Sequence, residues 1–493
     1  MTTTSSRRVR RWVLSAVAVL LAAGLVAGVL TGALPAATRA GLSATGLLVD
    51  GGSPTIAPGT LSGPTTAKPR SPATPTSAPR ARPTETPGPP PVLRPVEAGR
   101  LPRASRLTAK VDAVNRSGVQ GRISGSVVDV GSGRVLYRKN ASQAYVPAST
   151  LKLLTATAAL SALGPDHRFA TRVVQADRGK LILVGGGDPY LSATVSARFP
   201  HGASLSVLAR SAAAKLRKSK QTKVTLGYDT SLFSGASWHP DWPGKYRDQV
   251  TPVGALWVNE GRVYGATGAR VPKPAKAAAD TFANALRKNG VRVTRVSGAK
   301  ASRQAPEVAV VRSMPLDRIV EHLLMVSDND ASEVLARQVA VGSGRPGSFL
   351  EGRRAVQAQL QKLGVWDEST RIRDGSGLSR SNRVSARLLT RLLRLNMAGA
   401  HPELRAVATG LPVAGVEGSL RIRFYDKATR SARGLVRGKT GTLTGVHGLA
   451  GYVRSPDGAF LAYAFLVNDA KDGAAARLWL DKVASAISTC GCR

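Results

Sequence analysis

Ser149 and Lys152 stand three residues apart at the start of an apolar run, residues 149–163, that is rich in alanine and leucine. The run keeps roughly helical spacing and Pro147 stands just ahead of it, so we expect a mostly buried helix. Residues three apart share one helix face, so the hydroxyl and the amine would meet one turn apart. Free backbone N–H groups at that helix end favour a developing negative charge. The pair could therefore act as a serine nucleophile with a lysine base.

A lysine can act as that base only if its amine is uncharged near neutral pH. The pKa of Lys152 would have to fall from about 10.4 towards about 7, which corresponds to about 4 to 5 kcal/mol. An exposed amine cannot acquire so large a change, whereas burial or a neighbouring cation lowers a lysine pKa. We therefore expect a site that is dry or that holds a second cation.

Two further polar motifs follow along the chain. A Ser-Asp-Asn segment begins at Ser327, directly after a helix-patterned run at residues 316–326, and a Lys-Thr-Gly-Thr segment begins at Lys439, at the end of a predicted strand. Taken alone, the first is explained by a polar loop with a helix cap and the second by a turn. A second Ser-x-x-Lys pattern at residues 297–300 opens no apolar helix, and we reject it. The order of the three motifs is more specific than any single motif.

Strands are predicted near both ends of the folded part, which begins near Ser105. We expect a hairpin from residues 121–130 and 134–138, strands at 435–439, 448–454 and 460–468, and a closing helix at 472–488. Strands at both ends with helices between them indicate an α+β fold, in which one antiparallel sheet is assembled from distant segments and flanked by helices. Residues 166–312 differ, because short strand-like pieces alternate there with Gly-rich turns. We interpret them as a β-rich domain inserted after the helix that carries Ser149.

The charge of the chain needs an explanation. The 493 residues carry a formal net charge of +40, and 43% of them are hydrophobic, which is enough for two or more folded units. No zinc-finger spacing, aromatic-interleaved basic motif or heptad repeat accompanies the charge, so we expect no nucleic-acid partner. A solvated arginine-rich surface is the simpler interpretation, and an anionic membrane or wall polymer would suit it as a partner.

The N-terminus predicts export. Arg7, Arg8, Arg10 and Arg11 precede residues 12–34, which contain no charged residue. That run exceeds a typical secretory apolar core and reaches the length of about 20 residues that spans a membrane. The basic cluster should remain in the cytoplasm, which places the rest of the chain outside. We expect a membrane anchor, or a signal, and therefore an extracytoplasmic protein.

The three motifs, in this order, resemble the signatures of penicillin-binding proteins and serine β-lactamases. With the long insert and the segments 185–189, 228–229, 239–242 and 374–378, the chain is similar to the D-alanyl-D-alanine carboxypeptidase/endopeptidase family, the low-molecular-mass class C penicillin-binding proteins (peptidase family S13). The resemblance covers roughly residues 105–488 and implies the transpeptidase-like fold of that superfamily. The anchor and the long tether depart from the simple cleaved signal of many members.

The expected organisation has four parts. Residues 35–104 are dominated by Thr, Ser, Gly and Pro, which predicts a disordered tether. The parts are a basic stub with the anchor or signal (1–34), the tether (35–104), a penicillin-binding catalytic domain (105–165 and 313–493) and the inserted domain (166–312).

The resemblance implies a role for each motif residue. Ser149 would attack the carbonyl of the penultimate D-alanine of a peptidoglycan stem peptide, Lys152 would take its proton, and D-alanine would leave. Ser327 would relay a proton to the leaving amine, and Asn329 would hold Lys152 and the substrate amide. Lys439 would supply the cation that binds the terminal carboxylate and would lower the pKa of Lys152 by repulsion.

The strand that follows Lys439 would bind the substrate through Thr440, Gly441 and Thr442. The two threonines would donate hydrogen bonds to it. The backbone N–H groups of Ser149 and Thr442 would form the oxyanion hole, where one donor is typically worth about 3 kcal/mol of barrier. β-Lactams would acylate the same serine, water would hydrolyse the acyl-enzyme, and no cofactor is implied.

Simpler interpretations are favoured for the remaining motifs. We expect the Gly-rich turn at residues 374–378 mainly to fix backbone shape, and His239 to be a packed residue of the insert. None of the six histidines has metal-ligand spacing, and Cys490 and Cys492 are too few for a zinc site, so we expect no metal.

Two alternative functions stay open. A serine β-lactamase would need rapid deacylation, but the chain has no Glu-x-x-Leu-Asn segment, and the long insert is foreign to that group. A non-catalytic penicillin-sensing or wall-binding protein would use the cationic surface rather than the chemistry. Turnover of a chromogenic cephalosporin tests the first alternative, and release of D-alanine from a stem peptide tests the second. The number of chains that assemble is not indicated.

Overall fold

The computed structural model describes residues 99–197, 199, 202–263 and 269–491. Every described residue belongs to one compact unit, Pro91–Arg493. The predicted stub and anchor, and most of the predicted tether, lie outside the described residues. Within the described ranges, no helix combines the length and apolar character needed to cross a membrane.

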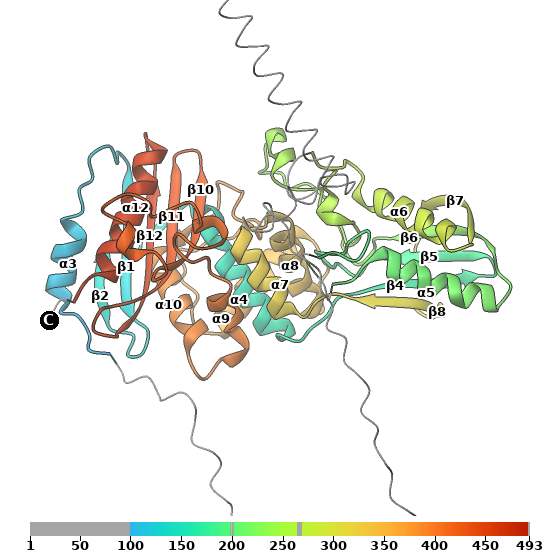
Figure 1. Cartoon of the computed structure of the whole chain (residues 1–493), viewed down its shortest axis with the longest axis horizontal. Coiled ribbons are helices and arrows are strands. Elements are labelled where there is room, and N and C mark those ends of the chain that lie inside the picture. The colour runs from blue at the N-terminus through green and yellow to red at the C-terminus, as the bar shows by residue number, and fades with distance from the viewer. Residues whose placement is uncertain (1–98, 198, 200–201, 264–268, 492–493) are drawn as a thin grey trace, which may run out of the picture. The chain divides into compact units, whose positions relative to one another are not determined.

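A five-stranded antiparallel sheet carries the motif at Lys439, with the strand order β10-β11-β12-β1-β2 (Figure 1). Its strands are β1 (Arg122–Asp129), β2 (Val135–Lys139), β10 (Arg437–Leu443), β11 (Val446–Arg454) and β12 (Phe460–Asn468). Strands from the two ends of the folded part lie side by side, because β1 pairs with β12 along its whole length. The predicted antiparallel sheet of distant segments is therefore confirmed, although β10 begins and ends later than we expected.

Helices cover both faces of this sheet. Tyr463 and Phe465 of β12 pack into a core with α3 (Ala104–Asp112) and α12 (Gly473–Ser488). Ala462 and Ala464 pack into a second core with α4 (Lys152–Leu163) and α10 (Ala386–Met397). Successive strand residues point to opposite faces, so a strand covered on both sides is apolar throughout.

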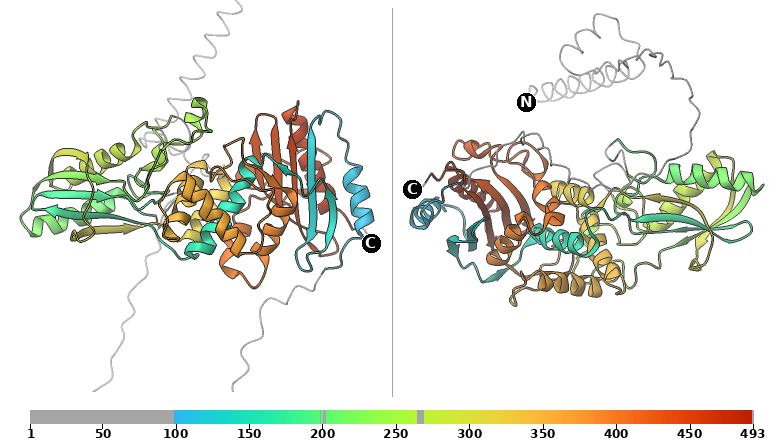
Figure 2. Two further views of the ribbon diagram at one scale, coloured as in Figure 1. Left: turned by 180° about the vertical axis from the view of Figure 1, so that it is seen from behind. Right: turned by 90° about the horizontal axis from the view of Figure 1, so that it is seen from below.

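The helix α4 is the buried centre of the second core. All its residues from Lys152 to Leu160 are buried, as the apolar run predicts. Contacts with α4 come from α7 (Leu316–Val326), α8 (Asn329–Gly342), α9 (Phe349–Lys362), α10 and α11 (Ala406–Thr409). Figure 2 shows these helices gathered between the two sheets of the unit. The lysine at the start of α4 is thereby removed from solvent.

A second five-stranded sheet, in the order β7-β6-β5-β4-β8, lies within residues 170–312. Its elements are β4 (Ala170–Asp177), β5 (Lys180–Val184), α5 (Leu205–Lys218), β6 (Lys223–Asp229), α6 (Pro274–Lys288), β7 (Arg292–Gly298) and β8 (Glu307–Arg312). The expectation of a merely β-rich insert was incomplete. The pairs β5–β6 and β6–β7 are parallel, so α5 and α6 serve as crossovers and pack on the sheet. The boundaries of the inserted domain remain a prediction.

Short elements complete the unit. They are β3 (Ala144–Tyr145), β9 (Val384–Ser385) and the 3₁₀ helices η1 (Ala148–Leu151), η2 (Gly244–Asp248), η3 (Asn259–Gly261), η4 (Pro402–Leu404), η5 (Gly418–Leu420) and η6 (Arg430–Ala432). Among them, η1, η2, η3 and η5 contribute residues to the site or to its support.

Candidate active site

Ser149 lies in the 3₁₀ turn η1, one turn before α4 begins at Lys152. The residue before it, Ala148, has a φ of 47°, in the left-handed region that a non-glycine residue rarely adopts. Gly377 packs against this turn so closely that a Cβ there would lie 2.0 Å from the Ala148 carbonyl oxygen. The nucleophile candidate is thus held in a strained turn rather than in the regular helix that we expected.

The amine of Lys152 connects three segments of the chain. Its Nζ donates hydrogen bonds to Ser149 Oγ at 2.9 Å, to Asn329 Oδ1 at 2.7 Å and to the Ser376 carbonyl oxygen at 2.7 Å. Its side chain is fully buried. The expected meeting of the hydroxyl, the amine and the Ser-Asp-Asn segment is present in the structure.

Two buried lysines give the site its electrostatic character. Burial lowers the pKa of Lys152 to about 8, against the opposing effect of buried carboxylates, chiefly Glu333 and Asp374. Burial also lowers the pKa of Lys439 well below its ordinary value, and the charge of Lys152 lowers it further. Of the two expected causes, a dry site and a second cation, burial is the one that lowers the pKa of Lys152, and the repulsion between the two lysines lowers the pKa of Lys439.

Lys439 and Ser327 form a second polar pair. Lys439 Nζ donates to Ser327 Oγ at 2.7 Å and to the Thr440 carbonyl oxygen at 2.9 Å. Ser327 ends α7 with a φ of 61°, and Asp328 caps α8 by accepting a hydrogen bond from the Ala331 N–H. The simple interpretation as a capped loop is therefore correct for this segment, and its role in a catalytic site stays a prediction.

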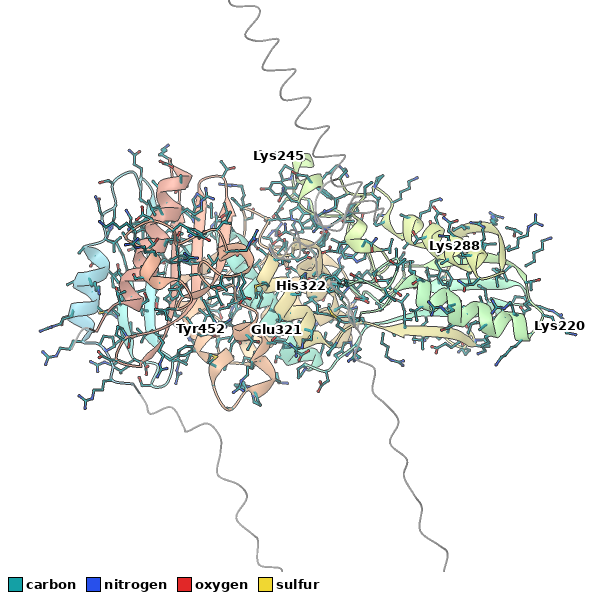
Figure 3. The ribbon with its side chains drawn as sticks, in the orientation of Figure 1. Lys220, Lys245, Lys288, Glu321, His322 and Tyr452 are labelled. Atoms are coloured by element: carbon teal, nitrogen blue, oxygen red, sulfur yellow. The ribbon has the colours of Figure 1, made fainter. Side chains whose placement is uncertain are left out.

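These groups border a cavity of about 600 Å³. Its lining combines the motifs with residues of the insert: Ser149, Ser327, Asn329, Thr440, Thr442, Leu443, Thr444, Gly377, Leu378, Lys245, Tyr246, Asp248 and Gln249. Lys245, which is labelled in Figure 3, lies on η2. Gly441 does not line the cavity, because β10 packs there against the nucleophile turn, and a Cβ on Gly441 would lie 2.7 Å from the Pro147 carbonyl oxygen.

Several groups of the site escaped the sequence analysis. The Ser376 carbonyl holds Lys152, and a backbone oxygen carries no signal in side-chain patterns. Glu333 on α8 accepts hydrogen bonds from the N–H groups of Gly375 and Ser376, which fixes that segment. The Gln249 carbonyl of the insert accepts from Asn329 Nδ2 at 3.0 Å. Of these groups, the sequence pointed only to the segment 374–378, whose glycine spacing predicted a turn of fixed backbone shape.

His239 is a packed residue, as predicted. One ring nitrogen is 3.0 Å from the Arg373 carbonyl oxygen, and the ring contacts Trp242 and Phe349.

One group of carboxyls could hold a metal ion on geometry alone. Oxygens of Glu260, Asp328 and Asp330 lie within 4.8 Å of one another, and all three residues are buried. Arg262 already forms ion pairs with Glu260 and Asp330, and Arg270 forms one with Asp330. We expected no metal from sequence spacing, and this cluster comes from segments too far apart for spacing to indicate it.

The sequence was compared with known protein families and proteins. The profile of the "D-Ala-D-Ala carboxypeptidase 3 (S13) family" matches residues 107–269 and 265–487. A carboxypeptidase of Mycobacterium tuberculosis is 34% identical over 425 residues, which cover 82% of this chain and 90% of that protein. A D-alanyl-D-alanine carboxypeptidase of Actinomadura sp. (strain R39) is 30% identical over 466 residues, which cover 78% of this chain and 84% of that protein.

Solved structures share the fold. Penicillin-binding protein 4 of Haemophilus influenzae matches with a TM-score of 0.62 at 23% identity, over 77% of this chain and 97% of that chain. A peptidoglycan endopeptidase of Bdellovibrio bacteriovorus matches with a TM-score of 0.50 at 17% identity, over 76% and 94%. The expected α+β penicillin-binding fold is confirmed.

Proposed function

The chain belongs to the D-Ala-D-Ala carboxypeptidase 3 (S13) family, and from this premise we propose that Ser149 is the nucleophile of a serine-type D-Ala-D-Ala carboxypeptidase. The substrate is the stem peptide of peptidoglycan, and the reaction passes through an acyl-enzyme. Lys152 is the general base. Ser327, Asn329 and Lys439 complete the catalytic group.

The hydrogen bonds of Lys152 carry this proposal. Two of its three partners, Asn329 Oδ1 and the Ser376 carbonyl oxygen, can only accept, so they retain N–H bonds whether the amine is charged or neutral. The third partner, Ser149 Oγ, can also donate. When Lys152 is neutral, its lone pair therefore points at the hydroxyl. A pKa near 8 makes the neutral amine available close to physiological pH.

Acylation follows from this arrangement. Ser149 Oγ bonds to the carbonyl carbon of the penultimate D-alanine, and its proton passes to Lys152 Nζ. The bond between that carbon and the leaving nitrogen then breaks, and the nitrogen takes the proton that Lys152 had accepted, relayed through the Ser327 hydroxyl. Because Ser327 Oγ accepts from Lys439, its own O–H is free to donate towards the cavity. Water later attacks the ester and releases the shortened peptide.

Recognition of the substrate is assigned to β10. Thr440 and Thr442 line the cavity, and their hydroxyls would donate to the terminal carboxylate, with Lys439 as the cation. Thr440 Oγ1 is held 3.0 Å from Ser419 Oγ. The backbone N–H groups of Ser149 and Thr442 would form the oxyanion hole. Gly441 acts indirectly, by allowing β10 to approach the nucleophile turn.

The same acyl transfer would also cleave a cross-link. In that reaction the leaving amine belongs to a second stem peptide instead of free D-alanine. A cavity of about 600 Å³ that is open to the insert leaves room for a larger leaving group. We propose endopeptidase activity as a second outcome of the same chemistry.

The reaction takes place outside the cytoplasm, where peptidoglycan is found. Residues 1–34 would export the chain and hold it at the membrane, and residues 35–104 would tether it. β-Lactams would acylate Ser149 as inhibitors.

Release of D-alanine from a stem pentapeptide analogue tests the function. The wild-type chain should release free D-alanine, and Ser149→Ala should abolish release while its unfolding temperature stays unchanged. Mass spectrometry after penicillin labelling should find the adduct on Ser149 alone. Ser297→Ala, in the rejected Ser-x-x-Lys pattern, is the matched control and should behave as wild type.

Two results would contradict the proposal. One is release of D-alanine by Ser149→Ala at the wild-type rate. The other is rapid, continuous turnover of a chromogenic cephalosporin without release of D-alanine, which would identify a β-lactamase.

A further inference from the structure

Glu260 is an unusual residue of the insert. It lies in η3, where Asn259, Glu260 and Gly261 have φ angles of 50°, 56° and 64°, and its side chain is 7% exposed. Consecutive left-handed residues are costly, and they persist only where surrounding contacts hold them. Thr251 provides such contacts, since its Oγ1 donates to the Glu260 carbonyl oxygen and its N–H donates to Asp330 Oδ1, both at 2.6 Å. The strained turn therefore points Glu260 at α8.

The charges in this cluster do not balance if every carboxyl is ionised. Arg262 lies 3.1 Å from Glu260 and 3.5 Å from Asp330, and Arg270 lies 3.0 Å from Asp330. Three carboxyls thus face two guanidinium groups. Leaving one buried negative charge uncompensated would be strongly destabilising.

Within the described part of the chain, Glu260 also lacks a hydrogen-bond donor for one of its carboxyl oxygens. Its Oε1 is buried, and among the described residues no N–H or O–H group donates to it. A carboxyl oxygen of Asp328 lies within 4.8 Å of a carboxyl oxygen of Glu260. A single proton on the Glu260 carboxyl would neutralise the excess charge and supply the missing hydrogen bond at once.

The electrostatic environment supports this location of the proton. Burial raises the pKa of Glu260 well above its ordinary value, and the Asp328 charge raises it further. Burial opposes ionisation of Asp328, but hydrogen bonds from Glu260 and from a backbone N–H hold its pKa low. Tyr190 OH, 3.4 Å from Asp328 Oδ2, also favours the Asp328 carboxylate, and His322 would favour it only when its ring is protonated. His322 is labelled on α7 in Figure 3.

We propose that the protonated carboxyl of Glu260 donates a hydrogen bond to Asp328 and thereby positions Ser327 and Asn329 for catalysis. This inference rests on the proposed function. Asp328 stands between the two catalytic residues, so its position sets theirs. A misplacement of about 1 Å at a catalytic group can cost about 100-fold in rate. Glu260 is a positioning residue, because it touches neither the substrate nor the cavity.

Two variants test whether the donor matters. Glu260→Ala removes it and should slow acylation by a fluorescent penicillin about tenfold or more. Glu260→Gln keeps a neutral donor and should restore acylation to within about threefold of wild type at neutral pH. Glu351→Gln is the control, since Glu351 is a carboxyl on α9 that forms ion pairs with Arg345 and Arg354, and this variant should acylate at the wild-type rate.

The pH profile gives a readout that a merely structural role would not move. Above the pKa of Glu260 the wild-type enzyme loses the shared proton, whereas the amide of Glu260→Gln cannot. The ratio of the two acylation rates cancels the titration of Lys152 and Lys439, which both enzymes share. We expect Glu260→Gln to be several-fold faster than wild type at about pH 10 and similar to it at about pH 7.

The inference is overturned by any of three results. The first is acylation by Glu260→Ala at the wild-type rate, and the second is a rate ratio that stays constant with pH. The third is loss of acylation when a chelator is added to the wild-type enzyme, with recovery when a divalent cation is added back. That third result would mean that the cluster is a metal site. Failure of the proposed function is separate, because Ser149→Ala would then still release D-alanine while the Glu260 variants keep their effects on penicillin acylation.

Discussion

At the scale of single residues, burial of Lys152, rather than a second positive charge, lowers the pKa of its amine and makes it available as a base. An amine in water keeps its proton far above neutral pH. Lys152 loses it more easily because α4 is covered on every side, and its two fixed acceptors hold it without supplying a negative charge. The hydroxyl of Ser149 is consequently the partner that can exchange a proton with it.

The pKa of Lys152 predicts how acylation depends on pH. The rate of acylation by penicillin should rise with pH through about 8, because only the neutral amine can accept the Ser149 proton. Lys152→Arg stays charged and should acylate about 100-fold more slowly or worse, with no rise near pH 8. Stopped-flow fluorescence with a penicillin reporter measures both. A rate that falls through pH 8 would contradict the assignment of Lys152 as base.

The same pKa predicts a trend in stability. The pKa of Lys152 is about 8 in the folded chain and about 10.4 in the unfolded chain. Between those values the unfolded state binds more protons, so the contribution of Lys152 to stability increases as pH rises through this window. Urea unfolding of wild type and Lys152→Met at several pH values isolates that contribution, because Met cannot titrate.

The sequence allowed side chains of the site to be predicted, but not backbone groups. Ser149, Lys152, Ser327, Asn329 and Lys439 follow from motif order, and the structure brings them together. The Ser376 and Gln249 carbonyl groups could not be predicted from motif order, since a residue of any type could supply a backbone carbonyl. Buried charged residues that hold the site in place, such as Glu333, could not be predicted either, because charged residues are normally expected at the surface.

At the scale of elements, the strained turn before α4 depends on one glycine. Gly377 has a φ of 89°, and a Cβ there would collide with the Ala148 carbonyl. Gly377→Ala should therefore lower stability by about 2 kcal/mol or more and slow acylation, because the turn must shift Ser149. Thermal unfolding and penicillin labelling measure the two effects.

Gly364 provides the control for that prediction. Its φ is 67°, but a Cβ there would meet nothing within 4 Å. Gly364→Ala should cost only about 1 kcal/mol, from backbone conformation alone, and leave acylation unchanged. Equal effects of the two substitutions on acylation would contradict the importance of the contact between Gly377 and the turn.

Elements with clean patterns were predicted best. β12 and α7 begin and end where the sequence indicated, because an unbroken apolar run and a regular helical stripe leave little choice. α8 was not predicted, since it buries Asp330, Glu333 and Arg337 among its apolar residues. The insert was underestimated for a related reason: α5 and α6 cover a partly parallel sheet, and local patterns do not reveal strand pairing.

At the scale of the whole molecule, the insert contributes to the candidate site rather than standing apart from it. It contributes η2 to the cavity lining, the Gln249 carbonyl to Asn329, and Glu260 to the carboxyl cluster that includes Asp328. The segment 327–329 is therefore contacted by two parts of the chain.

The N-terminal segment predicts where this unit works. Residues 12–34 should hold the full-length chain in the membrane of an export-competent bacterial host. Leu21→Arg places a charge near the centre of that run, which costs about 2.5 to 3.5 kcal/mol in a spanning helix, and should move activity from the membrane fraction to the soluble fraction. Penicillin labelling of both fractions measures the distribution.

A salt wash distinguishes attachment by a spanning helix from attachment by surface charge. A net charge of +40 could attach the chain to anionic lipids without any spanning helix, but such attachment is screened at about 1 M salt. Retention of wild type after the wash, and its release by detergent, would agree with an anchor. Release by salt alone, equal for wild type and Leu21→Arg, would instead mean that the cationic surface holds the enzyme at the membrane and that residues 12–34 are removed or do not span it.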